Sequence, residues 1–534
     1  MQLKITSENK ILIVALLVFL IAFCWQLFCT YGFDFFGEDF DVFHVYWERT
    51  AEFQKFQERY LPDSIQPSRF TLALGIGKEY IKQFFAPRRL LQIGFNSYSQ
   101  TDRPYQFLTW DLLKVFFGNN AMFYRVFKSI IFALNTCFIF FIILRVSKLF
   151  AILGVMLYMT SAEIWLSALY LNNLGLLAQC ATIISVFLFI KLIDKGPLSR
   201  KEMWLYYILI LLVSNCAVLT FGDARYLAII FFLTIVFFRR KELKLHAPML
   251  VLLLLMQFPI MGYFKKIFLD RTFAPINLTS HVNTSPSMLS TLFWSISNYR
   301  FFLNAMGKLI FVLLLIPIAT YLLSKTRQIL TAAFSKGSGK KKALFAPRNK
   351  EIILLSALWF ICSFIMVAKV RNFRYGSDPI SFMLYDLAYF IAPLIIFYCC
   401  YFAAIVNSDI KIGYRKSFLT LCICLIFLQL LSNVNRLSKF REKGAIELCS
   451  WKNAERFIEQ NSDNALALAL TKSQYRPFVF YNSANSVMST QLTCEESEFC
   501  NIDFLEEKFN AGGYDDIFII SSEELRFRGN PEAE

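Results

Sequence analysis

An acidic cluster directly follows the first apolar run of the chain. It contains Glu38, Asp39 and Asp41, with His44 a few residues further on. Read as a helix, residues 34–48 place aromatic side chains on one face and carboxylates on the other. Such a helix lies flat at a membrane surface and holds its carboxylates near the lipid headgroups. On this evidence alone, an interfacial helix with a solvated polar face is the favoured interpretation.

The same cluster has the residue types of a metal site. Asp39, Asp41 and His44 offer carboxylates and an imidazole, which accept divalent cations. The chain has 3 histidines, and His246 and His281 show no ligand spacing. A divalent metal is therefore the less favoured alternative, and the sequence defines no cofactor.

Charged residues near the ends of apolar runs are further candidates. Asp223 and Arg225 interrupt an apolar stretch, and charges near a membrane interior indicate a functional site, although a tight outer turn explains them equally well. Guanidinium groups match phosphate geometry with two parallel hydrogen bonds. The arginines that fall on the outer side of the predicted topology are Arg103, Arg125, Arg371 and Arg374. The last two also fit the usual role of interfacial anchors beside a span.

The composition requires a membrane to position these residues. Of 534 residues 56% are hydrophobic, and 59 are phenylalanine, more than the core of one soluble domain could bury. A helix needs about 20 apolar residues to cross the hydrocarbon core. The sequence predicts about eleven spans, at residues 11–30, 127–144, 150–170, 174–193, 204–221, 226–238, 248–263, 301–323, 352–368, 387–406 and 418–431.

The basic residues predict the orientation. The formal charge of +16 arises mainly in short loops between apolar runs, which is a topological signal and not one for nucleic acid. The loop 325–350 contains Lys340, Lys341 and Lys342 and no acid, so it is placed inside. The N-terminus is then cytoplasmic, and the segment 31–124 becomes a long exoplasmic loop.

The chain divides into two predicted domains. Residues 1–431 form the transmembrane module, and residues 432–534 form a small exoplasmic α/β domain. In that tail short apolar strands at 466–470, 478–481 and 517–520 alternate with helical stretches. Cys494 and Cys500 lie in this tail. The sequence allows either a disulfide between them or unpaired buried thiols.

A series of short motifs carries a resemblance to a known family. One span is followed by the pair Glu38-Asp39, then by the element Asp102-Arg103-Pro104 in a long outer loop, a Phe117-Gly118 turn, and Arg125 at the start of the next span. This order resembles the GT-C glycosyltransferases, among them the protein O-mannosyltransferases and the bacterial aminoarabinose transferases. It covers about the first quarter of the chain. The family's usual Asp-Glu order is reversed here, and Tyr105 stands where a second proline is usual.

The resemblance implies an inverting hexosyltransferase of the GT-C type. By position, Asp39 is the catalytic carboxylate, with Glu38 and Asp41 as rivals. Asp102, Asp223 and Arg225 are the candidate contacts to substrate. The chemistry agrees, because sugar transfer to a hydroxyl needs a base to take the hydroxyl proton. Nucleotide sugars are normally absent on the exoplasmic side, which points to a polyprenyl-phosphate-linked sugar as donor.

The acceptor and the class of protein have alternatives. The acceptor is a cell-surface glycan such as O-antigen or lipopolysaccharide, or a protein hydroxyl, in a bacterial inner membrane with a periplasmic site. A transporter or flippase of a lipid-linked saccharide is the second hypothesis, and it predicts charges within spans and broken helices. An O-antigen polymerase or ligase is the third.

Overall fold

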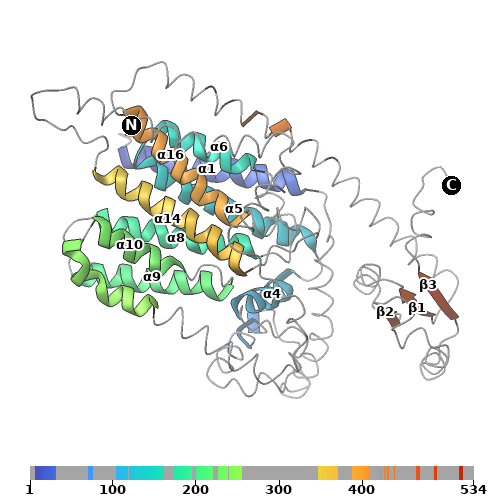
Figure 1. Ribbon diagram of the computed structural model, residues 1–534. Helices are drawn as coiled ribbons and strands as arrows, with labels where there is room; N and C mark the ends of the chain where they lie inside the picture. Colours follow the sequence, from blue (N-terminus) through green and yellow to red (C-terminus); the bar gives the residue numbers. More distant parts are fainter. Residues whose placement is uncertain are drawn as a thin grey trace, which may run out of the picture.

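The chain forms a bundle of apolar helices (Figure 1). The computed structural model describes residues 7–31, 104–117, 120–161, 174–194, 200–220, 226–238, 240–254, 347–370 and 388–407. It also describes scattered helical positions at 70–78 and 420–438 and three short strands. The statements below concern these residues.

The helices alternate in direction along the bundle. In chain order they are α1 (Ser7–Thr30), α4 (Pro104–Phe117), α5 (Ala121–Leu144), α6 (Lys148–Thr160), α8 (Gly175–Asp194), α9 (Arg200–Thr220), α10 (Leu227–Phe238), the 3-10 turn η3 (Arg240–Glu242), α14 (Pro347–Val370) and α16 (Ala388–Asn407). A further helical stretch covers residues 243–254. Helix α5 packs against α1, α6 and α8, and α14 packs against α16 and α10.

The two ends of the bundle carry different residues. At one end, called here the Thr30 end, α1 and α6 finish and α5 and α8 begin. At the other, called the Arg145 end, α5 and α8 finish and α6, α9 and the 243–254 helix begin. An ion pair between Arg145 and Asp194 joins the ends of α5 and α8 there. In the predicted topology the Thr30 end is exoplasmic.

Local chemistry explains where α5 starts. The side chain of Asn120 accepts a hydrogen bond of 3.0 Å from the backbone N–H of Met122, which satisfies one of the free donors of the first turn. The N–H of Asn120 donates to the backbone oxygen of Phe117, the last residue of α4, at 3.2 Å. The break between α4 and α5 therefore lies at the predicted Phe-Gly turn.

The helices pack closely around α5. Phe132, Ile139 and Ile142 of α5 are fully buried. Gly154 of α6 lies so near its neighbours that a Cβ atom would come 2.5 Å from Ile143 Cδ1 and 3.2 Å from Cys399 Sγ of α16. A Cβ atom at position 154 would require the Ile143 side chain to move, and a large side chain there would hold α6 away from both helices.

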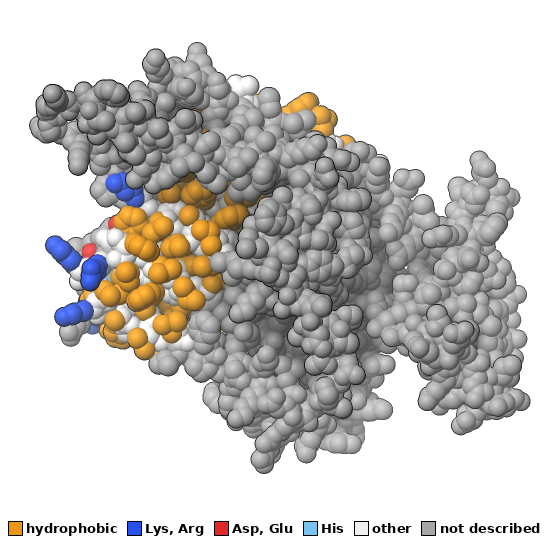
Figure 2. Space-filling view, in the orientation of Figure 1, with side chains coloured by type: hydrophobic (Ala, Val, Ile, Leu, Met, Phe, Trp, Pro, Cys, Tyr) orange, Lys and Arg blue, Asp and Glu red, His pale blue; other side chains and the backbone are white. Residues whose placement is uncertain are grey.

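Four described helices are long and apolar enough to cross a membrane, namely Ile11–Thr30, Ala121–Leu144, Gly175–Asp194 and Lys201–Val218. Three further apolar helices are shorter, at Lys148–Thr160, Leu227–Phe238 and Ile391–Ala404. Large apolar side chains on α1 and α9, such as Leu12, Phe28 and Leu212, point outward. Figure 2 shows one face of the bundle, where the apolar surface includes α9 and lysine and arginine side chains lie at the left edge. Such a surface suits lipid.

The predicted spans coincide with these helices over most of the described chain. The spans predicted at 127–144, 174–193, 204–221, 352–368 and 387–406 lie within α5, α8, α9, α14 and α16 to within one residue. The predicted span 150–170 is helical over α6, which finishes at Thr160, and 226–238 is the short helix α10. The predicted span 301–323 lies outside the described residues, and the total of eleven stays a prediction.

Three strands in the tail form one parallel sheet. β1 (Ala465–Ala469) lies between β2 (Ser486–Ser489) and β3 (Asp516–Ile520), with Leu466 paired to Ser486 and to Ile517. β1 and β3 lie where strands were predicted, within a residue at each end. The third strand lies at 486–489, and residues 478–481, where it was predicted, are outside the described part.

Candidate functional site

Two cations are buried in the first turns of α5, at the Thr30 end. The side chain of Arg125 is 1% exposed and that of Lys128 is 2% exposed. Because Lys128 follows Arg125 by three residues on a helix, both side chains lie on the same side of α5. Burying a cation is costly unless negative or strongly polar groups surround it. These two residues therefore mark a place where the protein favours negative charge.

Aromatic rings from α4 cover the start of α5. The Phe117 ring meets the Tyr124 ring edge-on, with centroids 5.3 Å apart, and Tyr124 is itself buried. Further along α4, Trp110 is buried against Leu174 at the start of α8. Apolar rings beside a buried cation lower the local dielectric and strengthen its attraction for an anion.

The register between α1 and α5 brings Gln26 to the same level. The thiol of Cys137 on α5 lies 3.4 Å from the backbone oxygen of Ala15 on α1. The two helices are antiparallel neighbours. Moving eleven residues forward along α1, from Ala15 to Gln26, therefore covers the same distance as moving eleven residues back along α5, from Cys137 to Val126, which is about 16 Å. Gln26 therefore lies level with the turn that holds Arg125 and Ser129.

Gln26 and Ser129 are buried polar groups with unused hydrogen-bonding capacity. Both side chains are 0% exposed. Among the described residues, neither amide atom of Gln26 nor the hydroxyl of Ser129 has a hydrogen-bond partner. Buried polar groups in native proteins are nearly always paired, so exceptions point to an unseen ligand or water. Here they lie level with two buried cations.

A polar network below these residues holds α5 in place. Asn135 Nδ2 donates to the Tyr158 hydroxyl of α6 and to the backbone oxygen of Leu176 on α8, both at 3.3 Å. The Tyr158 hydroxyl in turn donates to Gln179 Oε1 at 2.9 Å. All three side chains are buried. The network ties α5 to both α6 and α8.

A second anchored residue follows the predicted pair Asp223 and Arg225. The hydroxyl of Tyr226 accepts hydrogen bonds from Trp359 Nε1 at 3.2 Å and from Ser363 Oγ at 2.8 Å, which tie the start of α10 to α14. Asp223 and Arg225 themselves lie outside the described residues.

Of the predicted site residues, the structure describes Arg125. The others lie outside the described part of the chain, and their roles stay predictions. They are Glu38, Asp39, Asp41, His44, Asp102, Arg103, Asp223, Arg225, Arg371 and Arg374, and the same holds for Cys494 and Cys500. Within the part that is described, no group of three His, Cys, Asp or Glu side chains could hold a metal ion. The metal alternative at Asp39, Asp41 and His44 is not tested by that finding.

Sequence reasoning missed Lys128, Gln26 and Ser129. Lys128 follows the predicted start of a span by one residue and looks like an interfacial anchor. A signal was nevertheless present, because Gln26 is a polar residue inside an otherwise apolar run. What the sequence lacked was the register that places Gln26 level with α5's first turns.

Comparison with known proteins finds no protein-family model that matches this chain and no characterised protein sequence that matches it. The resemblance to the GT-C glycosyltransferases thus depends on the motifs quoted above.

Proposed function

We propose that this protein is an integral-membrane glycosyltransferase that moves a sugar from a polyprenyl-phosphate-linked donor to an acceptor on the exoplasmic face. The acceptor is a cell-surface glycan such as O-antigen or lipopolysaccharide, or a protein hydroxyl. The observation that carries the proposal is the burial of Arg125 and Lys128 at the Thr30 end of an apolar bundle. A soluble anion has no need of a site inside such a bundle, whereas the phosphate of a membrane-embedded carrier does.

In this proposal Arg125 and Lys128 bind the donor phosphate. The guanidinium supplies two parallel hydrogen bonds and the ammonium a point charge. The amide of Gln26 and the hydroxyl of Ser129 donate to the remaining oxygens. The carrier chain lies in lipid along α1, whose side chains Ile21 and Phe28 are more than half exposed. Arg103, Arg371 and Arg374 are further phosphate-binding candidates.

The reaction is an inverting displacement. Asp39, or one of its rivals Glu38 and Asp41, takes the proton of the acceptor hydroxyl as its oxygen attacks the anomeric carbon. The bond from that carbon to the phosphate oxygen breaks, and polyprenyl phosphate leaves with the additional negative charge. Buried cations stabilise charge that develops in the transition state more than they stabilise the starting donor. Asp102, Asp223 and Arg225 are the proposed contacts to substrate.

The proposed architecture places these groups on one side of the membrane. About eleven spans with a cytoplasmic N-terminus leave the loop 31–124 and an α/β domain at 432–534 on the exoplasmic face. In a bacterial inner membrane that face is the periplasm. Four apolar helices and the basic residues at the Arg145 end support this arrangement.

A flippase or transporter of a lipid-linked saccharide is the second candidate. Two buried cations and the Asn135–Tyr158–Gln179 network within the helices favour it, because polar groups inside a bundle often line a transport path. The two functions differ in their need for a base. A transporter tolerates Asp39→Asn, whereas a transferase does not.

The deciding experiment is sugar transfer from a lipid-linked donor in membranes that contain wild type, Asp39→Asn or Glu38→Gln. A transferase loses at least about a hundredfold of its rate in the variant that lacks the base. The matched control is Glu202→Gln, an exposed acid at the Arg145 end. Full activity in Asp39→Asn and Glu38→Gln, with normal insertion, would overturn the catalytic assignment.

A further inference from the structure

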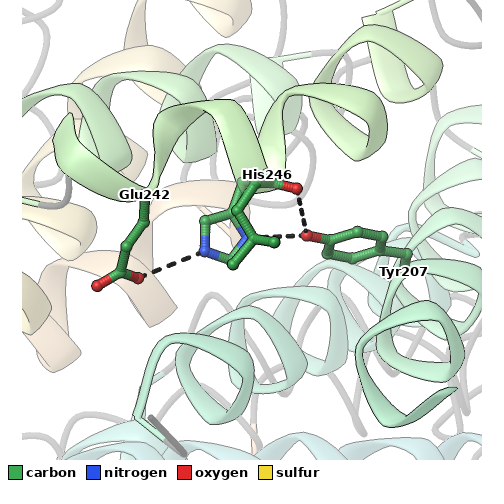
Figure 3. Close-up of polar contacts among 4 residues, drawn as sticks. Tyr207, Glu242 and His246 are labelled. Atoms are coloured by element: carbon green, nitrogen blue, oxygen red, sulfur yellow. Dashed lines mark hydrogen bonds and ion pairs between the residues drawn. The ribbon is translucent and has the colours of Figure 1, made fainter. Parts of the chain in front are cut away.

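A histidine is buried at the Arg145 end between two titratable side chains (Figure 3). His246 is 3% exposed. Its Nδ1 lies 3.0 Å from the hydroxyl oxygen of Tyr207 on α9, and its Nε2 lies 3.6 Å from a carboxylate oxygen of Glu242 in η3. The Tyr207 hydroxyl also lies 3.1 Å from the backbone oxygen of Leu245.

The Tyr207 hydroxyl has one proton and two acceptors within reach. If it donates to Leu245 O, the only role left toward His246 is to accept, so Nδ1 must carry a proton. A proton on Nε2 would then face the Glu242 carboxylate oxygen at 3.6 Å, a contact that stabilises positive charge, so we assign this arrangement to the imidazolium. If the hydroxyl donates to Nδ1 instead, the ring is neutral with its proton on Nε2. The two arrangements differ by one proton and by the direction of the Tyr207 O–H.

We propose that His246 is a proton-operated switch in the packing of α9 against the 243–254 helix. When Nδ1 gains a proton, the Tyr207 O–H turns from His246 to Leu245 O, and Nδ1–H donates to the Tyr207 oxygen. Protonation thus adds one interhelical hydrogen bond and converts the contact with Glu242 into an ion pair. The bonds between α9 and the 243–254 helix are stronger at low pH than at high pH.

Charged groups of the neighbouring elements set the field around the switch. Arg240, Lys241 and Lys244 on its own segment are exposed, as are Lys201 and Glu202 at the start of α9. Asp194 of α8 is paired with Arg145. Lys350 lies in the first turn of α14, and the buried Glu351 follows it. Glu242 touches the imidazole and is 40% exposed, so it connects the buried ring to the aqueous side.

The position of the switch extends its effect beyond one contact. From Tyr207, helix α9 continues to its last residue Thr220, which directly precedes residues 221–225 in the chain. A change in how tightly α9 is held at one end therefore bears on the segment that contains Asp223 and Arg225. The inference depends on the Tyr207, Leu245 and His246 geometry and does not require the proposed function.

The test is nuclear magnetic resonance of full-length protein labelled with 15N-histidine in lipid nanodiscs, from pH 5 to pH 9. His246→Gln assigns the signals by removing one set of three. We expect the His246 set to titrate, with a neutral form protonated on Nε2. In Glu242→Gln the proton affinity of His246 falls several-fold, so the midpoint of its titration moves to lower pH. Glu202→Gln leaves that midpoint unchanged. Tyr207→Phe weakens the preference of the neutral ring for the Nε2 proton.

Three results would overturn the proposal. They are a His246 set that does not change over this range, a neutral ring protonated on Nδ1, and equal midpoints in wild type and Glu242→Gln.

Melting temperatures provide the structural readout. A group that gains a partner in its protonated state stabilises the fold at low pH and loses that contribution as the pH rises. Tyr207→Phe removes this partner, so the melting temperature at pH 6 relative to that at pH 8 is lower in Tyr207→Phe than in wild type.

Discussion

The indole Nε1 of Trp25 donates a hydrogen bond of 2.8 Å to the backbone oxygen of Met159, near the end of α6. Together with the contact between Cys137 and Ala15, it holds α1 at two levels of the bundle. Much of the remaining surface of α1 is apolar and exposed. A few polar contacts thus fix the helix that precedes the acidic cluster and positions Gln26.

Removing the Trp25 donor tests this attachment. Trp25→Phe keeps an aromatic ring but loses the hydrogen bond to Met159, at a cost of about 1 kcal/mol. We expect a lower melting temperature of the purified protein in nanodiscs. Trp204→Phe is the matched control, because Trp204 on α9 is exposed. An equal effect of both substitutions would show that the Trp25 bond does not hold α1.

The network of Asn135, Tyr158 and Gln179 predicts energetic coupling. Tyr158→Phe removes one of the two acceptors of Asn135 Nδ2, which keeps the backbone oxygen of Leu176, and it removes the donor to Gln179 Oε1, at a cost of about 1–3 kcal/mol. In a double-mutant cycle with Gln179→Leu the two losses are expected to be non-additive by at least about 0.5 kcal/mol. Thr182→Ala serves as a control, since the Thr182 hydroxyl bonds the backbone of its own helix. Strict additivity would contradict the network.

The close approach at Gly154 predicts a steep dependence on side-chain size. Gly154→Ala requires Ile143 and Cys399 to shift slightly, whereas Gly154→Leu forces α6 away from α5 and α16 and costs about 1–3 kcal/mol or more. Melting temperatures of both variants provide the measurement. Gly75→Leu is the control, because a Cβ atom at Gly75 meets nothing within 4 Å. Equal stability of Gly154→Leu and wild type would disprove the packing.

Hydropathy predicted the helices well, and it could not predict what they contact. Runs such as 11–30 and 174–193 are long and apolar, so their helical state follows from the absence of water as a hydrogen-bond partner in lipid. Which face of α1 meets α5 depends on tertiary register, so the neighbourhood of Gln26 and Arg125 was not foreseen. The histidine at position 246 showed no ligand spacing, and its partner Tyr207 is far away in the sequence.

The tail shows the same limit for strands. β1 and β3 are short apolar runs that the sequence identified as strands. β2 has the sequence Ser-Val-Met-Ser, with two apolar residues between serines, and pairing with β1 defines it more than its own composition does. The catalytic carboxylate at Asp39 and the other residues outside the described part stay predictions from the sequence.

The most direct test of the central claim is binding of polyprenyl phosphate to the full-length protein in nanodiscs. Wild type is compared with Arg125→Gln, Arg125→Lys and Lys128→Gln, each checked for an unchanged melting temperature, and with Lys148→Gln at the Arg145 end as control. The account predicts a loss of about tenfold or more for Arg125→Gln, corresponding to one charge-assisted hydrogen bond, and a smaller loss for Arg125→Lys, which keeps the charge. Lys128→Gln weakens binding as well, and Lys148→Gln binds as wild type does. Undiminished binding by folded Arg125→Gln and Lys128→Gln would contradict the claim that these buried cations hold a lipid phosphate.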